Sequence, residues 1–137
     1  MRILAVDPGD KRIGLALSDA TGTIASPLQV LAHKSREADA ARIAALAAEH
    51  RAGRIIVGQA LGEDGRPNLS GRKAARLAGA LRAVTSLPVQ LWEESYSTQE
   101  ALAARRALGA STQVVDAHAA AVILQDYLDD NPTAPQT

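Results

Sequence analysis

Three short apolar segments precede the first helical pattern in this chain of 137 residues. Residues 2–7 and 13–19 are β-compatible runs, and the turn residues Asp7-Pro-Gly-Asp10 separate them. A third run covers residues 24–31, where Pro27 is expected to break the strand. Successive strands that are joined by short turns favour an antiparallel meander. The first part of the chain therefore predicts the antiparallel part of a sheet.

Strands and helices alternate in the rest of the chain. Apolar residues at helical spacing predict a helix over residues 36–50, with Gly53 as its stop signal, then a buried strand over 54–58 and a loop over 59–68. The further expected elements are a helix that Ser70 caps and that runs to about residue 85, a strand over 89–94, a helix with a capping box over 97–109 and a last helix over 115–128. This order predicts an α/β fold with a mixed central sheet flanked by helices.

The composition limits the class of protein. A chain of this length is expected to form one domain, over residues 1–130, with residues 131–137 as a disordered tail. Cysteine is absent, which excludes disulfides and thiolate metal sites and fits a cytoplasmic location. Neither a signal peptide nor a membrane-spanning run is visible, so no membrane partner is expected. Lys and Arg together number 15, as do Asp and Glu, so any surface that binds a polyanion must be a local patch.

Carboxylates stand at the ends of three expected elements. Asp7 ends the first strand and is followed by Gly9, where a ligand can approach the backbone closely. Glu93 and Glu94 end a later strand, in which alternation puts them on opposite faces. Asp116 begins the last helix. Each position also has a structural explanation, namely an Asp-Pro turn, an exposed strand end and a favourable place in the helix dipole. The residues alone leave both explanations open.

Basic residues form two groups. Lys11 and Arg12 follow the first turn, where they could hold phosphates. Arg72 and Arg76 lie four apart on one face of an expected helix, within residues 66–82, which contain no acid. This second group is the best candidate for a phosphate-binding patch, although a solvated helix face explains its spacing equally well. Two exposed bases in a turn, such as Lys11 and Arg12, are more often just solvated. Three histidines have no partner at a recognisable metal-ligand spacing, which argues against a zinc site: His33, His50 and His118.

Four blocks of sequence, spread in order over nearly the whole chain up to residue 128, carry a resemblance to one family. They are Asp7-Pro-Gly-Asp-Lys-Arg-Ile-Gly-Leu-Ala16, Val57-Gly58 with the glycine-rich loop that follows, Glu93-Glu-Ser-Tyr-Ser-Thr98, and Asp116-Ala-His-Ala-Ala-Ala-Val-Ile-Leu-Gln-Asp-Tyr-Leu128. With these blocks the chain resembles the YqgF family, also called RuvX. Ser95 stands where the family usually has an arginine, and residues 111–115 lack the basic residues that the family has there.

The resemblance implies a ribonuclease H-like fold in which three catalytic carboxylates meet, those of Asp7, Glu94 and Asp116. It implies that the same three residues bind Mg²⁺ or Mn²⁺ as a pair of ions, because hard oxygen ligands suit these cations and converging carboxylates repel one another without them. One ion would help to deprotonate the attacking water, and the second would stabilise the leaving 3′-oxygen. The residues expected to contact nucleic acid are Gly9, Lys11, Arg12, Arg72, Arg76, Ser97 and Thr98.

Members of the family are described as nucleases that process the precursor of 16S ribosomal RNA. The expected function is therefore 5′-end processing of this RNA during ribosome biogenesis, with a structured RNA precursor as the partner. One alternative is a resolvase that cuts branched, four-way DNA junctions as a homodimer. Another is a non-catalytic nucleic-acid-binding adaptor, which the neutral net charge and Ser95 make credible. A phosphate hairpin of the actin or sugar-kinase kind needs two lobes, and this chain has room for one.

Overall fold

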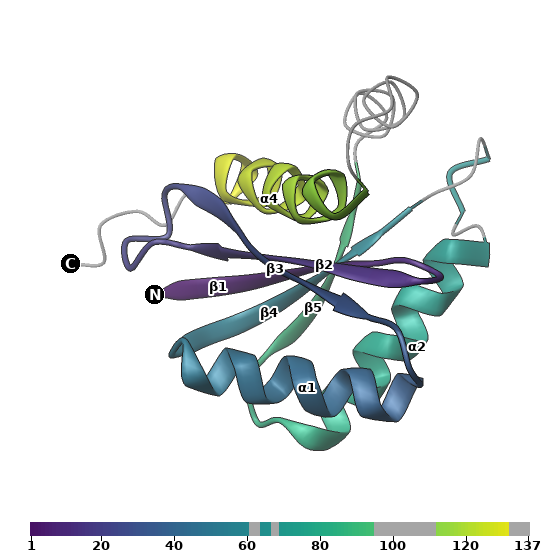
Figure 1. Cartoon of the computed structure of the whole chain (residues 1–137). Coiled ribbons are helices and arrows are strands. Elements are labelled where there is room, and N and C mark those ends of the chain that lie inside the picture. The colour runs from purple at the N-terminus through teal and green to yellow at the C-terminus, as the bar shows by residue number, and fades with distance from the viewer. Residues whose placement is uncertain (61–63, 67–68, 95–111, 132–137) are drawn as a thin grey trace.

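A mixed five-stranded sheet forms the centre of the protein (Figure 1). The computed structural model describes residues 1–60, 64–66, 69–94 and 112–131. The strands, in the order β3-β2-β1-β4-β5 across the sheet, are β1 (Arg2–Pro8), β2 (Arg12–Ser18), β3 (Ala25–Ala32), β4 (Ala52–Gln59) and β5 (Val89–Glu93). β1, β2 and β3 pair antiparallel, whereas β4 pairs parallel with β1 and with β5. The expected meander and the mixed sheet are confirmed.

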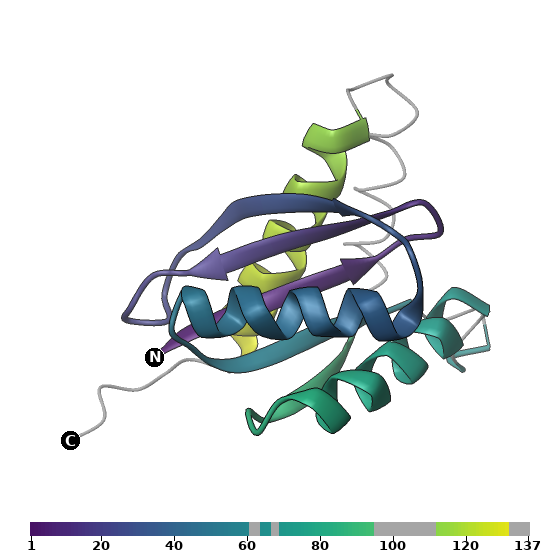
Figure 2. The ribbon, with the colours of Figure 1, turned by 60° about the horizontal axis from the view of Figure 1, so that its bottom comes forward.

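Helices cover both faces of the sheet (Figure 2). α1 (Arg36–Glu49) and α2 (Leu69–Val84) pack against each other below the sheet in Figure 1, and α4 (Thr112–Asp130) lies across the opposite face. Each face has a separate apolar core, built almost entirely from aliphatic side chains. The α/β class with a sheet flanked by helices is therefore confirmed.

β1 contributes side chains to both cores, because successive residues of a strand point to opposite faces. Leu4 and Val6 are fully buried in the core that α1 and α2 cover. Ile3 and Ala5 are buried in the core under α4. The phase of this central strand therefore decides on which face each of the following residues lies.

The expected break at Pro27 is wrong, since β3 runs through this residue. β3 is an edge strand, and there a residue without an N–H group is tolerated. The pairing with β2 is irregular beside the proline, because Leu15 pairs with Gln29 whereas Ala16 pairs with Pro27. An irregular step in the ladder thus accommodates the proline without ending the strand.

Two expected helix signals have other roles in the structure. α1 ends at Glu49, and the chain turns at Arg51, whose φ is 57°. Gly53 lies inside β4, which pairs with β1 from its first residue, so its interpretation as a stop signal is wrong. α2 begins at Leu69, so Ser70 is its second residue and not the residue before the helix, as was expected.

Part of the expected architecture falls outside the described residues. This applies to the helix over 97–109 and to 132–137 of the expected tail. In the parts of the chain that the structure describes, no helix has both the length and the apolar character needed to cross a membrane.

The turn between β2 and β3 is organised by the carboxylate of Asp19. One oxygen accepts hydrogen bonds from the backbone N–H groups of Thr23 (2.8 Å) and Ile24 (3.1 Å), and the other accepts one from the hydroxyl of Thr21 (2.6 Å). The Thr21 hydrogen bond, followed by the two backbone hydrogen bonds, lowers the pKa of Asp19 to about 2. The ionised carboxylate therefore stabilises the hairpin.

We expect the stability contribution of Asp19 to depend on pH. Because the folded pKa is about 2, below the ordinary value of 3.8, the contribution is fully present above about pH 4 and is lost as the pH falls toward 2. The difference in unfolding free energy between wild type and Asp19→Ala should therefore shrink over this range. Urea denaturation at pH 7, 4 and 2 measures it, and a difference that does not change with pH would contradict the role of the carboxylate.

Leu4→Ala tests the packing of the central strand. Leu4 has no exposed surface, so its truncation should lower the free energy of unfolding by about 2–5 kcal/mol. Ile24→Ala is the control, because Ile24 is 60% exposed and its truncation should change stability by less than about 0.5 kcal/mol. Chemical denaturation of the two variants measures both effects, and equal losses would show that β1 does not carry the core.

Candidate active site

Asp7 and Glu94 lie at the carboxyl ends of two parallel strands, on the face that α4 covers. Asp7 has the same strand phase as Ile3 and Ala5, which pack under α4. Trp92 also packs against this core, and Glu94 follows it by two residues in the direction of β5. Only β4 lies between β1 and β5, so their backbones are roughly 10 Å apart. The structure thus brings two of the three predicted catalytic residues to one edge of one face.

Gly58 of β4 provides the space between these two strands. A Cβ atom at Gly58 would lie 3.2 Å from Oε1 of Glu94 and 3.0 Å from Cδ1 of Ile123. The Glu94 carboxylate therefore turns back over β4, next to the helix that covers this face. The backbone N–H of Glu94 donates a hydrogen bond to the carbonyl of Gln59 (3.1 Å), which fixes the chain where the side chain begins. Glu93 is exposed, and its strand phase is opposite to that of Glu94, so alternation does put the two on different faces.

Polar contacts at its C-terminal end hold α4 on the sheet. Trp92 donates its indole N–H to Asp126 (3.2 Å), and its ring meets that of Tyr127 edge to face at 5.2 Å. Arg54 of β4 donates a hydrogen bond to the Tyr127 hydroxyl (2.8 Å). These contacts attach α4 to β4 and β5, the strands that carry Gly58 and lead to Glu94. By holding its C-terminal end, they also fix the position of the N-terminal end of α4.

Asp116 is the fifth residue of α4. It precedes Ala120 by four residues and Ile123 by seven, so the three positions share one helical face. Ala120 and Ile123 are buried against the sheet. The side chain of Asp116 lies outside the described part, so the convergence of all three carboxylates stays a prediction. Among the side chains that the structure does describe, no group of three or more His, Asp or Glu residues is arranged around a metal position.

The residues expected to contact nucleic acid lie on two elements. A Cβ at Gly9 would lie 2.4 Å from the carbonyl oxygen of Arg12, so the tight β1–β2 turn requires glycine there. Lys11 is exposed in this turn, and Arg12 is half-buried at the start of β2. Arg72 and Arg76 are both exposed on α2. Ser97 and Thr98 lie outside the described residues.

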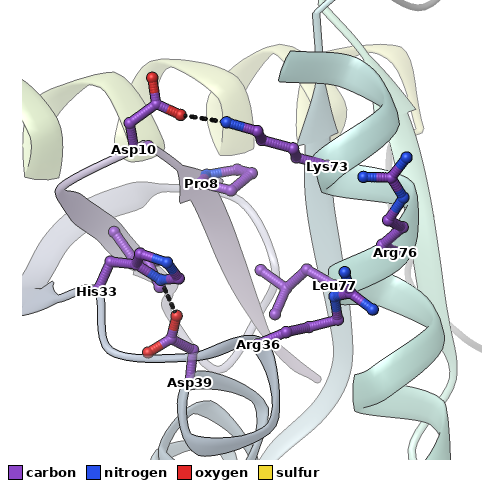
Figure 3. A pocket seen from close by; sticks show the side chains of 10 residues that line it. Pro8, Asp10, His33, Arg36, Asp39, Lys73, Arg76 and Leu77 are labelled. Carbon is purple, nitrogen blue, oxygen red and sulfur yellow. Dashed lines mark hydrogen bonds and ion pairs between the residues drawn. The ribbon is translucent and has the colours of Figure 1, made fainter. Parts of the chain in front are cut away.

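A cleft of about 330 Å³ on the other face was not predicted from the sequence (Figure 3). It lies between the β1–β2 turn, the start of α1 and α2. The Nζ of Lys73 donates a hydrogen bond to Asp10 across it (2.9 Å), and this bond and the lysine charge lower the pKa of Asp10. His33 pairs through Nδ1 with Asp39, which is 1% exposed. The one signal in the sequence was Asp39, an acid inside the apolar face of a predicted helix.

Comparison with known proteins identifies the family. The family described as "RuvX: Holliday junction resolvase" matches residues 1–130. The chain belongs to the RuvX family. It is 46% identical over 133 residues to a protein of Anaeromyxobacter sp. (strain Fw109-5), covering 94% of this chain and 97% of the relative. It is 40% identical over 134 residues to one of Pelotomaculum thermopropionicum, covering 94% and 87%. Both relatives bear the name "Putative pre-16S rRNA nuclease".

Solved structures agree on the fold of this RuvX member. RuvC of Thermus thermophilus, solved in complex with a Holliday junction substrate, superimposes with a TM-score of 0.59 at 21% identity over 98% of each chain. The fowlpox virus resolvase, solved with Holliday junction DNA, has a TM-score of 0.57 at 13% identity over 97% of this chain and 100% of its own. The expected family and the ribonuclease H-like fold are confirmed, and family membership makes the chain an enzyme that hydrolyses phosphodiester bonds.

Gly58→Ala tests the space beside Glu94. The added methyl group would press on Glu94 and on Ile123, which is 1% exposed and has little room to move, so we expect a loss of about 1–3 kcal/mol in unfolding free energy. Gly79→Ala is the matched control, because a Cβ there would have no atom within 4 Å apart from its own stretch of helix. This variant should gain about 0.5–1 kcal/mol as a helical residue. Thermal and urea unfolding measure both, and a neutral Gly58→Ala would mean that the carboxylate is not packed over this residue.

Proposed function

We propose that this chain is a metal-dependent endonuclease that acts in 5′-end processing of pre-16S ribosomal RNA, with residues 1–130 as the nuclease domain. The single observation that carries the proposal is the pair of carboxylates, Asp7 and Glu94, on one face of the sheet with Gly58 between them. The RNA substrate is supported by the names of relatives that match nearly the whole chain. Such a substrate implies a cytoplasmic location.

The donor set of this edge fits a divalent metal. Asp7 and Glu94 offer hard carboxylate oxygens, which suit Mg²⁺ or Mn²⁺, and Asp116 is the third ligand in the proposal. The missing Cβ of Gly58 leaves room for the Glu94 carboxylate to turn back over β4 toward this edge. When bound, a pair of ions would supply the activation of a water nucleophile and the stabilisation of the leaving oxygen. We propose that Asp7, Glu94 and Asp116 would together hold these ions.

The protein's own side chains would hold the substrate at this edge. The tight turn at Gly9 brings backbone N–H groups and the exposed Lys11 close to the end of β1, where Asp7 lies. We propose that Lys11, Arg12, Arg72 and Arg76 contact phosphates, since such contacts position a nucleic acid without reading its sequence. Ser97 and Thr98 complete the proposed contacts. Lys11 and Arg12, next to the end of β1, would align the scissile bond with the carboxylates.

A second candidate function is resolution of four-way DNA junctions, which the description of the matching family favours. A resolvase must cut two strands symmetrically, so this function would require a homodimer with two sites. Mass measurement in solution therefore bears on the choice of substrate. A monomer that cleaves RNA and leaves junctions intact would exclude the resolvase.

Asp7→Asn tests the nuclease. The change keeps the size of the side chain and removes the charge that would hold the cations, so we expect cleavage to fall by on the order of 100-fold or more. Cleavage is measured on labelled pre-16S ribosomal RNA and on a synthetic four-way DNA junction, each with Mn²⁺, with Mg²⁺ or with chelator. Asp130→Asn is the control, since Asp130 is exposed at the far end of α4 and should leave the rate unchanged.

Each result of this assay has a separate meaning. Metal-dependent cleavage that only the Asp7 variant loses supports the proposal, and the better substrate selects RNA processing or junction resolution. If folded wild-type protein binds both substrates and cuts neither with any metal, the nuclease proposal is wrong and the adaptor is the better description.

A further inference from the structure

The cleft under the β1–β2 turn lies beside the candidate active site but on the opposite face of the sheet. Asp7 has the strand phase of the α4 face, whereas the next residue, Pro8, lines the cleft on the face of α1 and α2. Their Cα atoms are about 3.8 Å apart across the peptide bond. A strand of nucleic acid that bends over the end of β1 would therefore reach both sites.

Two arginines of the cleft have their charge available for a ligand. Arg36, the first residue of α1, extends toward α2, where Arg76 lies on the opposite wall (Figure 3). Neither arginine makes an ion pair or a side-chain hydrogen bond with another residue in the described ranges. Lys73 adds a third cation, and its partner Asp10 is exposed, so this pair exchanges readily with solvent or a ligand. Guanidinium groups from two helices can bind one phosphate from two sides.

Hydrogen bonds and ion pairs around Asp39 hold the α1 wall of the cleft together. Asp39 is buried and accepts hydrogen bonds from the ring of His33 and from the backbone N–H of Lys34 (3.1 Å), while the guanidinium of Arg42 lies at 3.5 Å. With Nδ1 of His33 held by the carboxylate, Nε2 is the ring nitrogen available to a ligand. Arg42 also bonds to the carbonyl of Ala32, which ties the end of β3 to α1. The wall is thus formed before any ligand binds.

The floor of the cleft is apolar, and its size suits one nucleotide. Pro8, Ile13 and Leu77 line it, and the latter two are 2% and 6% exposed. A volume of about 330 Å³ is at the lower end of the range for small-molecule pockets. The phosphates of a duplex lie on a convex surface and would not enter such a cavity, whereas a base of a single strand can turn into it.

We propose that this cleft binds one nucleotide of a single-stranded segment that flanks the cleaved bond. The phosphate lies between Arg36 and Arg76, and the base contacts the apolar floor and the ring of His33. This inference rests on the proposed function in taking nucleic acid as the ligand. It adds a second contact region, which lies on the opposite face of the sheet from the carboxylates, just beyond the end of β1. This region would select substrates that have an unpaired segment.

Binding of a 5′-labelled single-stranded RNA of about eight nucleotides, followed by fluorescence anisotropy with chelator present, tests the proposal. Arg36→Ala and Arg76→Ala should each raise the Kd about ten-fold, because each loses a charge-assisted hydrogen bond to phosphate. Each should also lower the slope of log Kd against log salt by about 0.7. Lys34→Ala is the matched control, since it removes one exposed cation from the loop before α1, next to His33, and Lys34 does not line the cleft.

The outcomes separate this inference from the nuclease proposal. Because chelator is present, binding does not depend on cleavage. Both arginines are exposed, and circular dichroism confirms that the variants are folded. If both variants bind the RNA as wild type does, or if Lys34→Ala weakens binding equally, the inference is overturned even where cleavage persists. If uridine monophosphate binds to wild type and not to the variants while RNA binding is unchanged, the cleft takes a free nucleotide and the strand proposal is wrong.

Discussion

The close packing of α4 on the sheet is the constraint on which the candidate active site depends. Small residues on both sides allow it: Ala5, Ala16 and Gly58 on the strands, and Ala120 and Ala121 on the helix. With larger side chains the helix would stand further from the sheet, and the first turns of α4, which carry Asp116, would move with it. The polar contacts around Tyr127 then fix the position along the helix axis.

The alternation of β1 divides the functions between the two faces. One residue step separates Asp7, on the face where metal chemistry is proposed, from Pro8, in the cationic cleft. A shift of β1 by one residue would exchange the two faces and bury the charge of Asp7 under α1 and α2. The buried pairs Leu4–Val6 and Ile3–Ala5 oppose that shift, because both sets would have to exchange cores. Core packing thus fixes the strand phase of β1, and with it the face on which Asp7 lies.

Local signals allowed the sequence to predict the strands, the main helices, and the places of Asp7 and Glu94, which each end an apolar run. These local signals gave wrong predictions at positions where contacts with residues distant in the sequence determine the structure. Glycine is the residue type that commonly follows the end of a helix, yet Gly53 lies in β4, because this strand pairs with β1 from Ala52 onward. Pro27 is tolerated because β3 lies at the sheet edge, which only the strand order reveals. His33 had no visible partner in the sequence, and it pairs with Asp39 only in the folded chain. The cleft was not visible either, because Arg36 of α1 and Arg76 of α2 face each other only through tertiary packing.

The two faces of the sheet carry opposite charges at the end of β1: carboxylates on the α4 face and arginines on the face of α1 and α2. The chain is neutral as a whole, so long-range attraction of a polyanion is weak and binding must come from places where one sign of charge is concentrated. Carboxylates at the α4 edge repel phosphate unless cations accompany them, whereas the arginines of the cleft attract it without any cofactor. A strand held first in the cleft would bring a phosphodiester to the carboxylates at high effective concentration. The cationic cleft therefore offsets the repulsion that the acidic site alone would impose on its own substrate.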